Sequence, residues 1–135
     1  MHRELSYDTH VFLWTLFSPD KLADKARRAI EDPNNTIYVS SVTYWEISLK
    51  YALGKLVLTN IQPDALPDTA TRMGFETMSL DDRMASTFYK VPRDRHRDPF
   101  DRLIVWQAIS QNAVLITKDK RLSSYKRLGL KTLWR

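Results

Sequence analysis

The chain has 135 residues, of which 43% are hydrophobic and 27% are charged. This length corresponds to a single domain with its own core, and the composition excludes a disordered chain. The absence of cysteine excludes a disulfide scaffold, a thiolate metal site and a cysteine nucleophile. Because no apolar run reaches the roughly 18–20 residues of a membrane-spanning helix, and no secretion signal precedes the first strand, we expect a cytoplasmic protein.

Positive charge is concentrated in the last third of the chain. Residues 1–89 carry 9 Lys and Arg against 12 Asp and Glu, a net charge of −3, whereas residues 90–135 carry 12 against 4, a net charge of +8. Clustered basic side chains attract phosphate groups. The distribution therefore favours a polyanionic partner such as nucleic acid, although a merely solvated basic surface would give the same count.

Short apolar runs alternate with amphipathic stretches, and no internal repeat or linker interrupts them. This alternation is typical of βα units that form a parallel sheet, which binds ligands at the carboxyl ends of its strands. In chain order, we expect a strand at 5–7, helices at 11–17 and 21–31, a strand at 36–40, helices at 42–53 and 64–73, a strand at 75–79, helices at 81–89 and 99–111, and strands at 114–117 and 128–133.

Two acidic residues directly follow predicted strands. Asp8 comes after the first strand, and Asp119 follows the strand at 114–117. Each carboxylate could simply cap the helix or turn that begins after it. Because the carboxyl ends of parallel strands meet at one edge of a sheet, both could also face a common ligand there.

Glu46 lies in the middle of the predicted helix at 42–53. At helical spacing it shares a face with three apolar residues, Val42, Leu49 and Leu53. This spacing predicts that the carboxylate points toward the core. The alternative is an ordinary ion pair with Lys50, four residues further along the helix.

Two more acids open the predicted helix at 99–111. Asp98 precedes a proline and is a natural N-cap, and Asp101 occupies the third helical position, from which an acid can reach back to the cap. Asp101 also heads an apolar stripe formed by Ile104, Val105 and Ala108. The stripe predicts that Asp101 extends a buried face.

Four carboxylates in one cleft repel one another and raise one another's pKa values unless a cation neutralises them. A site made only of oxygen ligands suits Mg²⁺ or Mn²⁺. Nearby basic residues are expected to hold a polyanion against this site, and hydrolysis of a phosphodiester bond is the simplest reaction that unites metal and polyanion. These basic residues are Arg93, Arg95, His96, Arg97, Lys118 and Lys120.

Four stretches of the sequence resemble the motifs of PIN-domain proteins, and the likeness is closest to the VapC-type toxins of bacterial toxin–antitoxin pairs. The stretches cover residues 7–14, 40–47, 96–104 and 115–119. The resemblance implies a single PIN-like domain over residues 1–135. Its implied fold is an α/β/α sandwich with a central parallel sheet of about five strands surrounded by helices.

The resemblance also implies an endoribonuclease that depends on Mg²⁺ or Mn²⁺ and uses a water molecule activated by the metal. By position, four acids would surround the metal, Asp98 would support the site, and Thr117 would lie beside the water or a ligand. The four acids are Asp8, Glu46, Asp101 and Asp119.

The likeness further implies a homodimer and an antitoxin whose tail fills a groove over the site. Several aromatic side chains are candidates for such a surface, although core packing is the simpler expectation for most of them. They are Phe12, Trp14, Phe17, Tyr44 and Trp45.

Two other functions compete with this interpretation. A non-catalytic nucleic-acid-binding or assembly module of the same fold would need the basic face but has no reason to bury acids. A phosphatase with an aspartyl nucleophile would match Asp8, but such enzymes place a second Asp two residues further on, where this chain has His10.

Overall fold

Five parallel strands form one sheet, in the order β3-β2-β1-β4-β5, within the part of the chain that the structure describes. This structure is a computed structural model, and it describes residues 2–94 and 96–135. The central strand β1 pairs with β2 on one side and with β4 on the other, so that Leu5 lies opposite both Ile37 and Val114. The strands are β1 (Glu4–Tyr7), β2 (Thr36–Ser40), β3 (Glu76–Met78), β4 (Val114–Ile116) and β5 (Lys131–Leu133).

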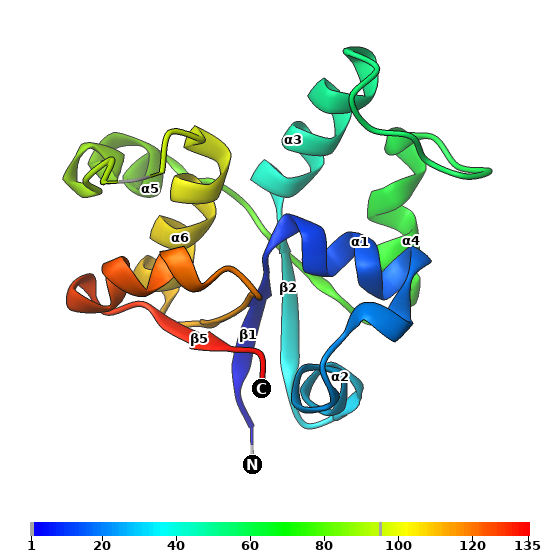
Figure 1. Cartoon of the computed structure of the whole chain (residues 1–135), viewed down its shortest axis with the longest axis horizontal. Coiled ribbons are helices and arrows are strands. Elements are labelled where there is room, and N and C mark those ends of the chain that lie inside the picture. Colours follow the sequence, from blue (N-terminus) through cyan, green and yellow to red (C-terminus); the bar gives the residue numbers. More distant parts are fainter. Residues whose placement is uncertain (1, 95) are drawn as a thin grey trace.

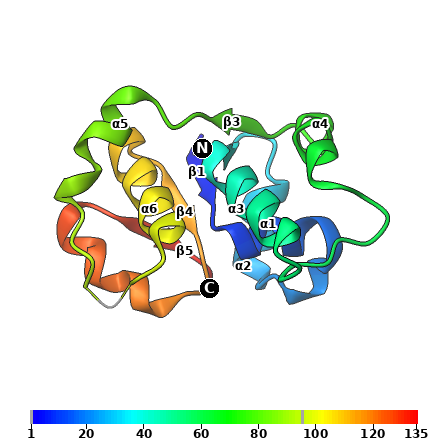
Figure 2. The same ribbon diagram turned by 90° about the horizontal axis from the view of Figure 1, so that it is seen from above.

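Helices connect these strands and pack on both faces of the sheet. Figure 2 shows α5 and α6 gathered to one side of β1 and the first four helices to the other side. The α-helices are α1 (Thr9–Phe17), α2 (Asp24–Glu31), α3 (Ser41–Ala52), α4 (Leu66–Arg72), α5 (Asp82–Thr87) and α6 (Pro99–Gln111). Short 3₁₀ segments are η1 (Pro19–Lys21), η2 (Pro63–Ala65), η3 (Phe88–Lys90) and η4 (Lys120–Leu128).

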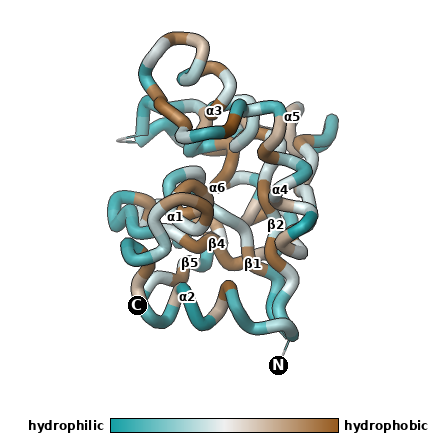
Figure 3. Tube along the Cα trace, turned by 90° about the vertical axis from the view of Figure 1, so that its right-hand side faces the viewer, coloured by the Kyte–Doolittle hydropathy of each residue, from teal (hydrophilic) through white to brown (hydrophobic). Residues whose placement is uncertain are grey.

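The sheet separates two hydrophobic cores because neighbouring side chains of a strand point to opposite faces. Leu5 and Ile116 belong to the core beneath α1, α2 and α4. Leu115 belongs to the core beneath α6, together with Val105 and Tyr125. In Figure 3 the hydrophobic residues follow β1 and β4 through the middle of the molecule. The predicted α/β/α sandwich around a parallel sheet is therefore confirmed.

A buried polar contact joins α3 to α6. The Ser40 hydroxyl accepts from the Val42 N–H at 2.9 Å, which caps α3, and it also donates to the Gln107 side chain of α6. Gln107 donates in turn to the Met78 carbonyl at 3.2 Å. Because unsatisfied buried polar groups are costly, this chain of bonds fixes the position of both helices relative to β2 and β3.

The direction in which successive strands are added to the sheet reverses between β1 and β4, and their carboxyl ends mark this point. Chain connections leave these two strands toward opposite sides, which opens a crevice in sheets of this kind. Figure 1 shows that α1 begins at this end of β1 and that α3 and α6 flank the same end. The fold therefore brings the starts of three helices to one edge of the sheet.

The predicted element boundaries agree closely at 36–40 and 99–111 and differ elsewhere. The last strand was expected at 128–133, but β5 begins only at Lys131, because η4 continues to Leu128 and ends at Gly129 with φ 102°. The second helix was expected to start at residue 21 but starts at Asp24, after the 3₁₀ turn of η1. Ser6, which interrupts the apolar run of β1, is fully buried.

The described residues include no helix with both the length and the hydropathy that a membrane span requires.

Truncation of Ile116 in β4 tests the core around the central strands. Its side chain is 0% exposed. Ile116→Ala should lower the free energy of unfolding by about 2–5 kcal/mol, because it removes buried apolar surface and leaves a cavity. Urea denaturation measures this change. As a control, Val57→Ala at a site that is 86% exposed should change stability by less than about 0.5 kcal/mol; equal losses in both variants would contradict the assigned core.

Candidate active site

Asp8 links the carboxyl ends of β1 and β4. Its backbone N–H donates to the Ile116 carbonyl at 3.1 Å. One carboxylate oxygen, Oδ1, accepts from the His10 N–H at 2.8 Å and caps α1, which confirms the capping role considered from the sequence. The other oxygen, Oδ2, accepts from the Thr117 hydroxyl at 2.7 Å. Asp8 therefore caps its helix and also faces the end of β4.

His10 lies beside this carboxylate at the surface. Its Nδ1 is 3.7 Å from Asp8 Oδ1. The interaction with Asp8 raises the pKa of His10, although partial burial of the ring opposes the shift. A positive charge on His10 is thus favoured at the edge of the site.

Arg121 holds both oxygens of Asp119. The Arg121 Nε and Nη2 atoms each donate to Asp119 at 3.0 Å, and the Arg121 backbone N–H donates to Oδ1 at 2.9 Å. Burial alone would raise the pKa of Asp119, but the bonds from Arg121 outweigh this effect and lower it. The Thr117 hydroxyl accepts from the Asp119 N–H at 3.0 Å, so one threonine contacts two of the acids.

Glu46 is buried, with 1% of its surface exposed. Its Oε1 accepts from the Thr9 hydroxyl at 2.8 Å, and its Oε2 accepts from Lys50 Nζ at 2.5 Å. Both sequence interpretations are therefore present: the carboxylate points inward, and it also pairs with Lys50. The apolar face predicted for this helix is wrong, however, because Leu49 and Leu53 are 40% and 58% exposed.

Asp98 and Asp101 lie at the start of α6. Asp98 caps the helix by accepting from the Phe100 N–H at 2.9 Å, as its position before Pro99 predicted. No hydrogen bond to the Asp101 carboxylate is found among the described residues. Burial raises the pKa of Asp101 to about 7, and the negative charges of Asp98, Asp8 and Glu46 add to the effect. Asp101 is thus the acid that the protein leaves uncompensated.

Three of the acids line a pocket of about 400 Å³, whereas Glu46 and Asp98 do not line it. Asp8, Asp101 and Asp119 line it, together with Lys118, Lys120 and Arg121. Donor atoms of Glu46, Asp98 and Asp101 lie within 4.8 Å of one another, and so do those of His96, Asp101 and Asp119. Asp101 belongs to both groups.

This arrangement fits a divalent cation. Burial, together with the negative charges of Asp98, Asp8 and Glu46, raises the pKa of Asp101, and a cation bound at these acids would favour its ionised form. Ligand atoms within 4.8 Å of one another can meet at a single ion after small side-chain movements. Oxygen donors are the ligands that Mg²⁺ and Mn²⁺ take.

The expected RNA contacts divide into three groups. Lys118 and Lys120 line the pocket with the acids. Arg93 and Arg97 are exposed but do not line that pocket, and Arg95 lies outside the described residues.

The position of His96 corrects an expectation. It is 3% exposed and packs on Tyr125 with ring centroids 5.5 Å apart, so its ring is not available to RNA at the surface.

Sequence reasoning missed two functional neighbours of the acids. Thr9 and Arg121 bind Glu46 and Asp119, and each stands within two residues of a predicted site acid. Their closeness in sequence to Asp8 and Asp119 could have indicated these two residues. It does not reveal, however, that the Thr9 side chain contacts an acid on another helix.

Comparison with known proteins identifies relatives of this chain. The sequence matches the PIN domain family over residues 7–128. It is 28% identical to "Ribonuclease VapC22" of Mycobacterium tuberculosis over 127 residues, which cover 94% of this chain and 95% of that protein.

Two solved structures have a similar fold. VapBC2 from Rickettsia felis, bound to a promoter DNA fragment, has a TM-score of 0.67 at 20% identity, covering 98% of this chain and 99% of that one. VapBC-5 from Mycobacterium tuberculosis, a member of a family of toxin–antitoxin systems, has a TM-score of 0.61 at 19% identity, covering 98% of both chains. At these identities the likeness concerns the fold alone.

The raised pKa of Asp101 predicts a pH-dependent effect of removing its charge. The folded protein retains a proton that the unfolded chain loses near pH 3.8, so the stability contributed by neutral Asp101 is lost as the pH rises through about 7. In EDTA, Asp101→Asn should already exceed the wild type slightly in unfolding free energy at pH 5, and by more at pH 8.5, because the loss runs from pH 3.8 to about 7. Allowing for solvent screening, the gain should be on the order of 1–2 kcal/mol.

Urea denaturation at both pH values measures this difference. Asp64→Asn, at an exposed acid in η2, controls for a general loss of negative charge. An equal gain for Asp101→Asn at pH 5 and pH 8.5 would show that burial and neighbouring carboxylates do not raise its pKa.

Proposed function

This chain belongs to the PIN domain family, and from that premise we propose that it is an endoribonuclease that depends on a divalent metal and acts as the toxin of a toxin–antitoxin pair. The observation that carries the proposal is the convergence of four other acids around Asp101, whose pKa is raised to about 7. The names of its relatives, a VapC ribonuclease and VapBC complexes, support the same function.

Mg²⁺ or Mn²⁺ is the cofactor that the site would hold. Asp101 would contribute to binding in every arrangement, because its carboxylate belongs to both groups of donor atoms. Asp8, Glu46 and Asp119 would complete the ligand set, and Asp98 would support it. When bound, such an ion lowers the pKa of a water molecule and clamps phosphoryl oxygens, which is the chemistry that phosphodiester hydrolysis requires.

The side chains around the acids would orient them for this task. The Thr117 hydroxyl donates to Asp8 Oδ2, and the Thr9 hydroxyl donates to Glu46 Oε1. These hydrogen bonds fix the orientation of both carboxylates. Lys118 and Lys120 stand at the same pocket with their charges free of any described ion pair. They would bind the phosphate groups of the substrate and bring the bond to be cleaved to the acids.

An antitoxin and a second copy of the chain are the proposed protein partners. The predicted aromatic surface is only partly exposed: Phe12 is buried and Trp14 and Tyr44 are half-buried, whereas Trp45 is 54% exposed. Trp45 lies on α3 one and two turns before the exposed Leu49 and Leu53. This apolar face supports a protein partner there. We further propose that the chain acts in the cytoplasm as one domain.

Loss of the Asp101 carboxylate should abolish cleavage. With labelled single-stranded RNA and Mn²⁺ or Mg²⁺, Asp101→Asn should reduce the rate by at least about 100-fold, because it removes the acid shared by both donor groups. Gel analysis of the products, with EDTA as the metal-free condition and antitoxin-free protein, measures the effect. Asp64→Asn is the matched control and should cleave at the wild-type rate; cleavage by Asp101→Asn at that rate would refute the site.

Binding of the ion can be measured without cleavage. Mn²⁺ at about 100 times its dissociation constant should stabilise the wild type by about 2.7 kcal/mol, because the ion binds the folded state alone. The stabilisation should be greater at pH 8 than at pH 6, since the proton on Asp101 must leave first. Thermal unfolding of the wild type, Asp101→Asn and Asp64→Asn checks this. No shift in the wild type, or an equal shift in Asp101→Asn, would contradict a metal site at these acids.

A further inference from the structure

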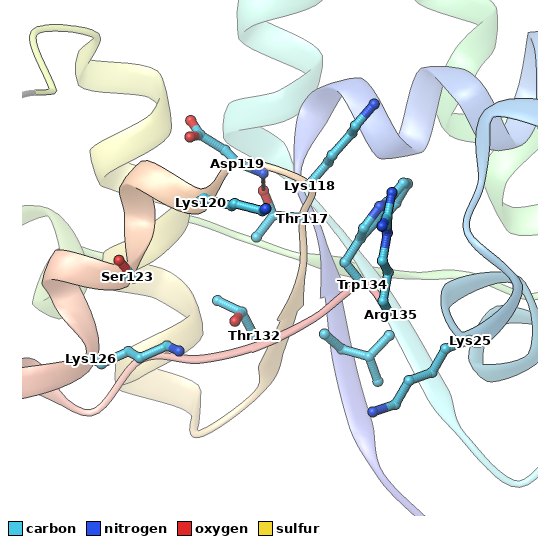
Figure 4. Close-up of a pocket in the computed structure, with 11 residues that line it drawn as sticks. Lys25, Thr117, Lys118, Asp119, Lys120, Ser123, Lys126, Thr132, Trp134 and Arg135 are labelled. Atoms are coloured by element: carbon cyan, nitrogen blue, oxygen red, sulfur yellow. Dashed lines mark hydrogen bonds between the residues drawn. The ribbon is translucent and has the colours of Figure 1, made fainter.

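A second, larger pocket of about 590 Å³ lies beside the site, against the end of β5. Its volume is within the range of ordinary ligand pockets. Figure 4 shows that its lining comes from segments far apart in the sequence. Lys25 comes from α2, Lys126 from η4, and Thr132 from β5, while Trp134 and Arg135 follow that strand. None of these residues belongs to the acid cluster.

The lining of this pocket is strongly basic. It contains five cationic side chains and a single acid, Asp119, both of whose oxygens are already held by Arg121. In Figure 4 Lys126 lies on one side of the pocket, Lys25 on the opposite side and Lys120 above them. These lysines take part in no described ion pair. Converging cations without counter-charges favour an anionic ligand.

The basic pocket adjoins the pocket that Asp8, Asp101 and Asp119 line. Both are lined by Lys118, Asp119 and Lys120. In Figure 4 the side chains of Lys118 and Asp119 point out of the basic pocket at its upper rim. A ligand that extends across this rim therefore reaches the acids directly.

Tryptophans stand along the same path. Trp14 lines the acid pocket and Trp134 lines the basic pocket, and their ring centroids are 5.9 Å apart. Lys118 Nζ lies 5.9 Å from the Trp14 ring centroid. Both rings are half-buried and thus partly open to a ligand. Aromatic faces beside lysines are the combination with which proteins bind single-stranded nucleic acids, by stacking on bases and neutralising phosphates.

We propose that the basic pocket formed by Lys25, Lys120, Lys126 and Trp134 binds the single-stranded RNA segment adjoining the bond that is cleaved. The proposal rests on the proposed ribonuclease function and adds the course of the substrate beyond the acids. Lysine ammonium groups contact phosphates without reading bases, and stacking on tryptophan tolerates every base. This pocket therefore contributes affinity and direction, and little sequence preference.

The test measures RNA binding with the full chain in EDTA, separately from cleavage. The probe is a fluorescein-labelled oligouridylate of about 12 nucleotides, a length that single-strand sites commonly cover. Fluorescence anisotropy gives the binding constant between about 50 and 300 mM NaCl. The double variant Lys25→Gln/Lys126→Gln should bind about 10-fold more weakly at 100 mM. Its slope of log K against log salt should be shallower by about 1.4, which is about 0.7 for each lost phosphate contact.

The matched control is Arg72→Gln/Lys131→Gln, which removes the same charge from exposed residues of α4 and β5 outside the pocket. It should change the affinity by less than about 2-fold. Equal slopes for the two double variants would overturn the proposal. A polyglutamate peptide that displaces the RNA with comparable affinity, in a manner that depends on Lys25 and Lys126, would also overturn it in favour of an acidic protein ligand.

A separate assay of cleavage in Mn²⁺ distinguishes failure of this proposal from failure of the proposed ribonuclease function. Wild-type cleavage together with unchanged binding by Lys25→Gln/Lys126→Gln would refute the pocket and leave the ribonuclease intact. Absence of cleavage together with the expected loss of RNA binding would support the pocket as an RNA site and refute the ribonuclease.

Discussion

The repulsion among carboxylates at one edge of the sheet is the constraint on which the site depends. A parallel sheet directs the ends of β1 and β4 to the same place, and the middle of α3 and the start of α6 bring further acids there. Glu46 and Asp119 are compensated by Lys50 and Arg121, which lie four and two residues further along the chain. Asp101 forms no ion pair with any described residue, and burial together with the neighbouring carboxylates raises its pKa.

The groups that neutralise or hold these carboxylates come from different parts of the chain. Lys50 and Arg121 are local in sequence, so Glu46 and Asp119 are neutralised by their own segments, and Asp8 is held by Thr117 across the sheet. Among the described residues, no hydrogen bond holds the Asp101 carboxylate, so a bound cation would favour its charged form. The acid cluster favours binding of a cation, and the basic pocket next to it favours binding of an anion. A metal ion and the phosphates of a nucleic acid therefore match these two neighbouring sites.

Much of this arrangement is predictable from the sequence, because strand ends and helix starts have local signals. Asp8 and Asp119 follow apolar runs, and the pair Asp98-Pro99 marks a helix start. The orientation of α3 was not predictable from its apolar spacing, since Leu49 faces outward while Glu46 is buried. A carboxylate can occupy the interior once a hydroxyl and an ammonium group satisfy it, and those partners are set by tertiary packing. The basic pocket was predicted only in part: Lys118 and Lys120 were expected to contact RNA, but Lys25 reaches the pocket from a helix far away in the sequence.

The hydrogen bond between Thr117 and Asp8 joins residues 109 positions apart. During synthesis β1 emerges from the ribosome early, but its partner β4, together with Thr117 and Asp119, is made only after more than a hundred further residues have been added. Contacts of such sequence separation form late. A nascent chain therefore carries an incomplete set of acids throughout most of its translation. The order of strands in the sheet thus makes completion of the acid cluster depend on the last part of the chain to be synthesised.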